Sequence, residues 1–290
     1  MKKIRKFLSR KRQRLHYLFR YFVCSLPQIS QGVTCKKRNT PIVISFTSYK
    51  KRYSTLALCI KSLLNQSVKP DFIHLYISEK DAELPADVLK LKSKGLFVKI
   101  VPEDLGPHGK YYHVMQSHSK NIIITVDDDI LYDKNLIKDL LSSYNKYPNA
   151  ISARRVHLMR KNKNSILPYN QWSWECSTYQ FPSLALFATG VGGVLYPPEI
   201  LPPQAFDKEV IKKLILKQDD IWLKYIELKE NIPVVYVPHA HPHLIAIKEA
   251  QNSGLCNANV SQSQNDFYIK ILSEHFSLNL TDYALDEGFK

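Results

Sequence analysis

Cysteine, glycine and long apolar runs are all scarce in this chain of 290 residues. The five cysteines are odd in number and none forms a C-x-x-C pair, which argues against a disulfide framework or a zinc site and favours a reducing compartment. No G-x-G-x-x-G or G-K-[ST] sequence occurs, so neither a dinucleotide fingerprint nor a P-loop is indicated. No apolar stretch is long enough to span a bilayer.

Acidic residues are absent from the first 70 positions. That segment holds 17 Lys and Arg, whereas the remaining 220 residues hold 24 basic and 26 acidic side chains. The net charge of +15 is therefore an N-terminal feature attached to a nearly neutral body. A protein that binds nucleic acid across its surface would spread its basic side chains further, so we expect no nucleic-acid partner.

Residues 1–26 combine this charge with an apolar periodicity. Apolar side chains recur at helical spacing, namely Ile4, Phe7, Leu8, Leu15, Leu18, Phe19, Phe22 and Val23. Basic residues fill much of the rest, a pattern typical of an amphipathic helix on an anionic membrane surface. A signal peptide and a solvated basic tail are the alternatives. We expect the surface helix, which would hold the protein at the cytoplasmic, inner face of a membrane.

After a polar linker, strand patterns and helix patterns alternate. Strands are expected at 42–46, 72–78, 96–102 and 121–126, with helices between them at 55–65, 85–94 and 110–119. This alternation predicts a parallel sheet with right-handed crossovers. Further helices are expected at 135–147 and 218–228, and further strands at 151–156 and 234–237.

Three consecutive carboxylates, Asp127, Asp128 and Asp129, follow the fourth expected strand. That strand is almost continuous Ile and Val, which is typical of a strand buried on both faces. Three like charges repel one another, and a divalent cation with oxygen ligands, such as Mg²⁺ or Mn²⁺, would remove that penalty. Because α/β sheets bind ligands at the carboxyl ends of their strands, we expect this acidic trio to face a cleft. A polar turn that caps a helix is the alternative.

Four blocks of the chain together resemble the GT-A-type glycosyltransferases, in particular the bacterial family-2-like enzymes of surface polysaccharide and lipopolysaccharide biosynthesis. The blocks are residues 42–52, 127–129, 188–198 and 219–223, in this order. The resemblance implies a GT-A (Rossmann-like), mostly parallel sheet flanked by helices. It also implies transfer of a sugar, with inversion, from a nucleoside diphosphate sugar, above all a UDP-sugar, to a hydroxyl of a glycan or glycolipid.

The resemblance also implies how the chain is divided. Residues 1–39 would be the basic helix and its linker, and residues 40–290 the glycosyltransferase domain. Within that domain the donor half would cover about 40–155 and the acceptor half about 156–290.

On the donor side, the resemblance implies that Asp127 and Asp129 bind Mn²⁺ or Mg²⁺, which would bridge the two phosphates. His241, one of three alternating histidines, is a further candidate metal ligand, and an ordinary loop histidine is the alternative. The residues implied in nucleotide binding are Thr47, Ser48, Tyr49, Arg52, Asp104, Lys110 and Asp128.

On the acceptor side, the resemblance implies that Asp219 or Asp220 is the general base that takes a proton from the attacking hydroxyl. The sequence does not separate the two, and helix capping is the alternative for each. The candidates for contact with the acceptor are three glycines and two tryptophans: Gly190, Gly192, Gly193, Trp172 and Trp174. A tight turn is the alternative for the glycines, and core packing is the alternative for the tryptophans.

Two rival functions use some of the same features. A nucleotidyltransferase also places an acidic metal pair on a parallel sheet, but it would have a glycine-rich loop after the first strand, and residues 47–52 contain no glycine. A non-catalytic nucleic-acid-binding protein would account for the basic N-terminus, but the near-neutral remainder of the chain argues against it.

Overall fold

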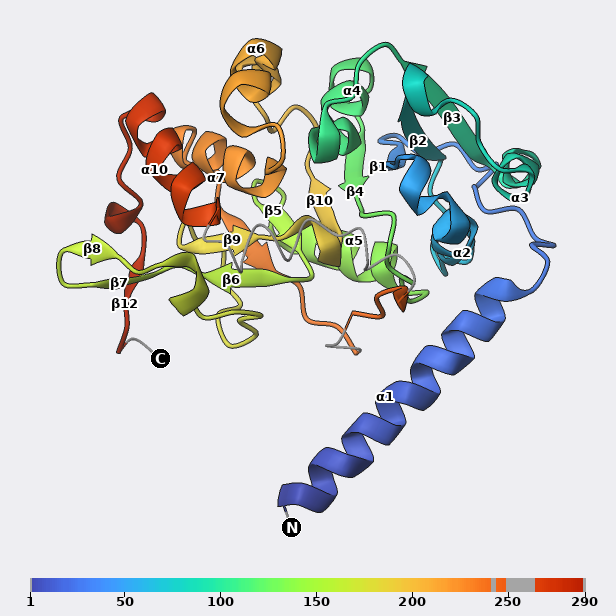
Figure 1. The fold of residues 1–290 in the computed structure, drawn as a ribbon, viewed down its shortest axis with the longest axis horizontal. Helices are drawn as coiled ribbons and strands as arrows, with labels where there is room; N and C mark the ends of the chain where they lie inside the picture. The colour runs from blue at the N-terminus through green and yellow to red at the C-terminus, as the bar shows by residue number, and fades with distance from the viewer. Residues whose placement is uncertain (1, 241–243, 249–263, 289–290) are drawn as a thin grey trace.

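The computed structural model describes residues 2–240, 244–248 and 264–288. Its centre is a seven-stranded sheet with the order β11-β5-β10-β4-β1-β2-β3. The strands are β1 (Ile42–Thr47), β2 (Phe72–Ser78), β3 (Leu96–Val101), β4 (Ile122–Thr125), β5 (Ile151–Ala153), β10 (Val194–Tyr196) and β11 (Val234–Tyr236). Figure 1 shows helices on both sides of this sheet. The predicted α/β class is confirmed.

The sheet is parallel except at one strand. β1 pairs in parallel with β2 and β4, β2 with β3, and β5 with β11. β10 lies antiparallel between β4 and β5. Since two antiparallel steps restore the direction, β4 and β5 point the same way, and the carboxyl ends of β1, β4 and β5 share one edge.

Two apolar cores lie on the two faces of the sheet, because alternate strand residues point to opposite sides. Ile42, Ile44 and Phe46 of β1 pack in one core, whereas Val43 packs in the other. The first face is covered by α2 (Tyr53–Leu64), α3 (Ala86–Lys90) and α5 (Leu136–Lys146). The second is covered by α4 (Gly109–Ser117), α7 (Asp219–Lys229) and α10 (Gln264–Phe276).

Smaller elements extend the second core. β6 (Val156–Leu158) pairs with β9 (Leu186–Ala188). β7 (Arg160–Asn162) pairs with β8 (Ser165–Ile166) and with β12 (Leu285–Asp286). The short helix α6 (Lys208–Val210) precedes α7. Neither these pairings nor α10 was predicted from the sequence.

The N-terminal segment is one helix, α1 (Lys2–Ser25), as predicted, and it projects away from the sheet (Figure 1). Its last turns contact the body, since Cys24 is buried and the Lys61 ammonium donates to the Ser25 carbonyl at 3.4 Å. Four large apolar side chains of its second half are more than half exposed: Leu15, Leu18, Phe19 and Phe22. Among the described residues, no helix combines the length and the apolar character needed to cross a bilayer.

Candidate active site

The acidic trio lies where β4 ends, beside the loop that follows β1. The Val126 amide still donates to the Ser45 carbonyl at 3.1 Å, and the chain then leaves the sheet. The Arg52 guanidinium lies 2.7 Å from Asp129 Oδ2 and 3.5 Å from Asp128 Oδ1. The Ser48 hydroxyl donates to Asp128 Oδ2 at 2.6 Å. Two residues predicted to bind the nucleotide therefore contact the trio itself.

A single buried ammonium joins the trio to the acidic pair at the start of α7. Lys110 Nζ lies 2.8 Å from Asp127 Oδ1 and 2.8 Å from Asp219 Oδ2. The Lys110 residue is only 4% exposed, because α4 begins directly over the carboxyl end of β1. The predicted metal ligand, the predicted phosphate-binding lysine and the two candidate general bases therefore lie together, although they come from three separate parts of the chain.

The glycine-rich segment closes this cluster. The Gly190 amide donates to Asp220 Oδ1 at 3.1 Å. A Cβ on Gly190 would lie 2.3 Å from Lys110 Nζ, and a Cβ on Gly192 would lie 2.6 Å from the Cβ of Arg155. Gly193 has a φ of 87°, which favours glycine. Packing and backbone geometry thus account for all three glycines, and their contact with an acceptor stays a prediction.

Replacing Gly190 with alanine should displace the Lys110 ammonium. We expect the added methyl to cost about 1–3 kcal/mol of unfolding free energy, as is usual for overpacking in a well-packed site. Sugar transfer should fall sharply, because the ammonium holds Asp127 and Asp219 together. Gly288→Ala is the control, since a Cβ there meets no atom within 4 Å. Equal activity and melting temperature in the two variants would contradict this role for Gly190.

The cluster is short of positive charge. Within the described residues, five carboxylates share two cations, with Arg52 and Lys110 facing Asp127–Asp129, Asp219 and Asp220. Burial, followed by the neighbouring carboxylates, raises the pKa of Asp220 to about 8. Burial also raises the pKa of Asp128 to about 7, against the opposing effect of Arg52. Carboxylates with such pKa values favour a further cation.

A comparison with protein families decides the class of this protein. Residues 42–185 match the model of the family described as Glycosyl transferase family 2. The chain contains a glycosyltransferase family 2 domain. It is therefore a glycosyltransferase, and the match includes Arg52, Lys110 and the acidic trio, whereas Gly190, Asp219 and Asp220 lie beyond it. No curated protein sequence matches the chain.

Solved structures resemble this glycosyltransferase only in part. Staphylococcus aureus TarS 1–349 is 15% identical, with 84% of this chain and 74% of that chain covered and a TM-score of 0.45. The mannosyltransferase PcManGT from Pyrobaculum calidifontis, in complex with GDP-Man and Mn²⁺, is 10% identical, with 77% and 61% covered and a TM-score of 0.44. A CMP:2-keto-3-deoxy-manno-octonic acid synthetase complexed with CTP is 12% identical, with 79% and 100% covered and a TM-score of 0.44. The family match, not these partial likenesses, identifies the domain.

The trio of this glycosyltransferase fits a divalent cation in its donor chemistry and its charge. In the part of the chain that the structure describes, no group of three or more His, Cys, Asp or Glu side chains is arranged to hold a metal ion. Mg²⁺, however, is usually held by one or two carboxylates together with substrate phosphates. The surplus of carboxylate charge around Lys110 also matches a cation that arrives with its nucleotide.

Of the alternating histidines, only His239 lies in the described part of the chain. Its Nδ1 lies 3.1 Å from the Val237 carbonyl. His241, the candidate ligand, and His243 lie outside the described residues, so the structure says nothing about this part of the prediction.

The other three residues predicted to bind the nucleotide are Thr47, Tyr49 and Asp104. The Thr47 hydroxyl donates to the Tyr76 carbonyl at 2.9 Å, and the Tyr49 ring lies 5.9 Å from the Arg52 guanidinium. Asp104, after β3, pairs with Lys80 at 2.6 Å and accepts from the Gly106 amide. All three residues lie at the carboxyl ends of strands, where the prediction placed them.

The two tryptophans differ in access. Trp172 is 4% exposed and packs against Tyr169 and Phe187, with ring centroids 4.9 and 5.5 Å apart. Stacking of Trp172 on a sugar does not fit this burial, because the ring is part of the core. Trp174 is 39% exposed and stacks on His157 with ring centroids 4.9 Å apart. Part of its surface is therefore accessible to a ligand.

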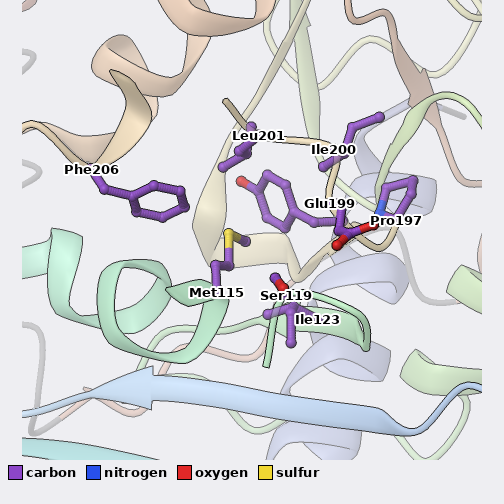
Figure 2. Close-up of a pocket in the computed structure, with 9 residues that line it drawn as sticks. Met115, Ser119, Ile123, Pro197, Glu199, Ile200, Leu201 and Phe206 are labelled. Carbon is purple, nitrogen blue, oxygen red and sulfur yellow. The ribbon is translucent and has the colours of Figure 1, made fainter. Parts of the chain in front are cut away.

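Two cavities lie near the sheet, and neither is lined by the trio. The larger, of about 130 Å³, opens between Phe206 and Met115 on one side and Glu199 and Pro197 on the other (Figure 2). The smaller, of about 20 Å³, has Ile130, Asp133, Arg154 and His239 among its lining residues. Neither cavity is the cleft that we expected in front of the trio, where the Arg52 and Lys110 side chains pack against the carboxylates.

Proposed function

We propose that this glycosyltransferase moves a sugar from a UDP-sugar to a hydroxyl of a glycan or glycolipid, with inversion, in bacterial surface polysaccharide or lipopolysaccharide biosynthesis. The observation that carries the proposal is the Lys110 ammonium, which holds Asp127 and Asp219 at 2.8 Å each. It brings the donor end of β4 and the acidic start of α7 into one site. A sugar bound between them would have a leaving group on one side and a base on the other.

The donor side is the acidic trio with its two cations. We propose that Asp127 and Asp129 hold Mn²⁺ or Mg²⁺, which when bound neutralises charge on the diphosphate of the donor. Arg52 and Lys110 are buried against the trio, where they would also meet these phosphates and stabilise the charge that develops as the sugar leaves. Asp128, fixed by the Ser48 hydroxyl, orients the nucleotide.

We propose Asp220, not Asp219, as the general base. The Asp219 side chain is 6% exposed and is paired with Lys110. Asp220 is half-buried, and a pKa of about 8 suits a carboxylate that takes up a proton near neutral pH. A base on the acceptor side supports direct displacement with inversion.

A donor screen tests this proposal. We expect the protein with Mn²⁺ or Mg²⁺ to release UDP from one UDP-sugar when acceptor is present, and EDTA to stop the reaction. Turnover unchanged in EDTA would contradict the metal role. Release of pyrophosphate from CTP or UTP with a sugar phosphate would instead identify a nucleotidyltransferase, the rival that shares the acidic site.

We also propose that α1 lies on an anionic membrane at the cytoplasmic face. Its exposed apolar residues fall at positions 15, 18, 19 and 22, which share one side of a helix, and basic residues surround them. The apolar face supplies burial, and the positive charge supplies attraction to acidic lipids.

Replacing both Phe19 and Phe22 with serine should release the protein from anionic vesicles. Each Phe contributes about 1.5–3 kcal/mol when fully buried, so we expect binding to fall by at least about 10-fold even with partial insertion. Phe181→Ser is the matched control, because Phe181 is 68% exposed but lies outside α1. A protein that starts at Thr34 should bind these vesicles less than the full chain does. Equal co-sedimentation of the two proteins would contradict the proposal.

A further inference from the structure

Tyr132 contacts four separate parts of the molecule through its polar groups. It lies just beyond the acidic trio and is 2% exposed. Its hydroxyl accepts from the Asp127 amide at 2.9 Å and donates to the Val191 carbonyl at 3.0 Å. Its own amide donates to the Ser62 hydroxyl at 3.1 Å, and its carbonyl accepts from the Arg20 guanidinium of α1.

The two contacts of the hydroxyl join the two sides of the proposed reaction. Asp127 is the first carboxylate of the trio. Val191 lies in the glycine-rich segment, where the neighbouring Gly190 amide donates to Asp220 Oδ1 at 3.1 Å. One phenol oxygen therefore links the backbone of the metal-binding residue to the backbone that holds the base.

The hydroxyl is well suited to this link. A tyrosine hydroxyl can both donate and accept a hydrogen bond, as this one does toward the Val191 carbonyl and the Asp127 amide. The ring packs within the apolar core under the trio, which limits its movement. Removing the hydroxyl would leave the buried Asp127 amide and Val191 carbonyl without this partner, at a cost in free energy that favours rearrangement of both segments.

We propose that Tyr132 is a positioning residue whose hydroxyl sets the separation between Asp127 and the segment that holds Asp220. The inference rests on the proposed function, because it assigns these two residues to opposite sides of the reacting bond. Tyr132 itself does not need to touch the substrate. Its loss should affect the rate of transfer more than the binding of the donor, since each side of the site remains intact.

Tyr132→Phe tests the inference, because it removes the hydroxyl and keeps the ring. Its control is Tyr225→Phe, which removes an equally buried hydroxyl with two partners, the Ile269 carbonyl at 2.8 Å and the Ser273 hydroxyl at 2.6 Å. We expect kcat to fall about 10- to 100-fold in Tyr132→Phe, as is typical when a hydrogen-bond partner of a metal-binding residue is removed. The KM for the donor should change little. In the control we expect kcat to stay at the wild-type level, because the Tyr225 hydroxyl bonds α10 and no residue of the site.

Hydrogen–deuterium exchange provides a readout that does not depend on activity. We expect faster exchange in peptides covering residues 122–132 and 186–196 of Tyr132→Phe, and no change there in Tyr225→Phe. Unchanged exchange in both peptides would overturn the inference even if no donor sugar is found. An active wild type with equal kcat in the two variants would also overturn it, whereas a wild type inactive toward every nucleotide sugar would contradict the proposed function alone.

Discussion

Replacing Asp220 with asparagine is expected to slow sugar transfer by about 10²–10⁴-fold, the usual contribution of a general base. Asparagine has the same shape and can still accept the Gly190 amide, so the loop at residues 190–192 should keep its place. Donor binding should survive, because the contacts of Arg52 and Lys110 with the trio are untouched. Steady-state kinetics beside calorimetric titration of UDP with Mn²⁺ would separate these two effects.

Asp220→Asn should also make the stability of the protein less dependent on pH. The raised pKa of Asp220 means that the folded protein holds this proton more tightly than the unfolded chain does. The stability that this adds is fully present below the ordinary aspartate pKa of 3.8 and is lost as pH rises through about 8. The wild type should therefore lose melting temperature between pH 5 and pH 8, and Asp220→Asn should lose less. In the wild type kcat/KM should rise over the same interval, because the base must be ionised.

Asp219→Asn is the comparison that assigns the base. Asp219 is buried and paired with Lys110 at 2.8 Å, so its loss should disturb folding and the position of the ammonium. A mild effect on kcat beside the large effect of Asp220→Asn would support the assignment. If both variants transfer sugar at the wild-type rate, the base lies elsewhere in the protein.

Strands with a strong apolar pattern could be predicted from the sequence, including the three-residue strands β5 and β11, whereas β10 could not. The expected strand at 72–78 coincides with β2, and the expected run at 121–126 contains β4. β10 lies between three glycines and the pair Pro197-Pro198, so its segment has the composition of a loop although Val194 and Tyr196 are good strand formers. Its antiparallel entry between β4 and β5 depends on pairing partners from distant parts of the chain.

The same distinction holds for the site. The residue types at the carboxyl ends of the strands predicted the acidic cluster, because parallel strands bring those ends together. Their partners could not be predicted, since the ion pairs of Arg52 with Asp129 and of Lys110 with Asp219 form only in the folded protein. The packing requirement at Gly190 and the contacts of Tyr132 could not be predicted either, because each depends on a residue from another element.

Replacing Lys110 with methionine is expected to have the largest combined effect on stability and activity. The side chain of similar length fits the same space but leaves Asp127 and Asp219 without their shared cation. Breaking a buried ion pair in this way typically costs about 3–5 kcal/mol of unfolding free energy. The loss should be greater at pH 8 than at pH 5, because protonation relieves the unpaired carboxylates at lower pH.

Lys224→Met separates folding from chemistry in this comparison. Lys224 is as deeply buried as Lys110 and pairs with Glu227 at 3.1 Å, but it lies outside the site. We expect both variants to melt at lower temperature, and only Lys110→Met to lose transfer when each is assayed below its melting point. Mn²⁺ should also raise the melting temperature of Lys110→Met more than that of Lys224→Met, because the added cation enters a site that has lost one positive charge. Equal residual activity and an equal response to Mn²⁺ would show that Lys110 supports the fold without serving the reaction.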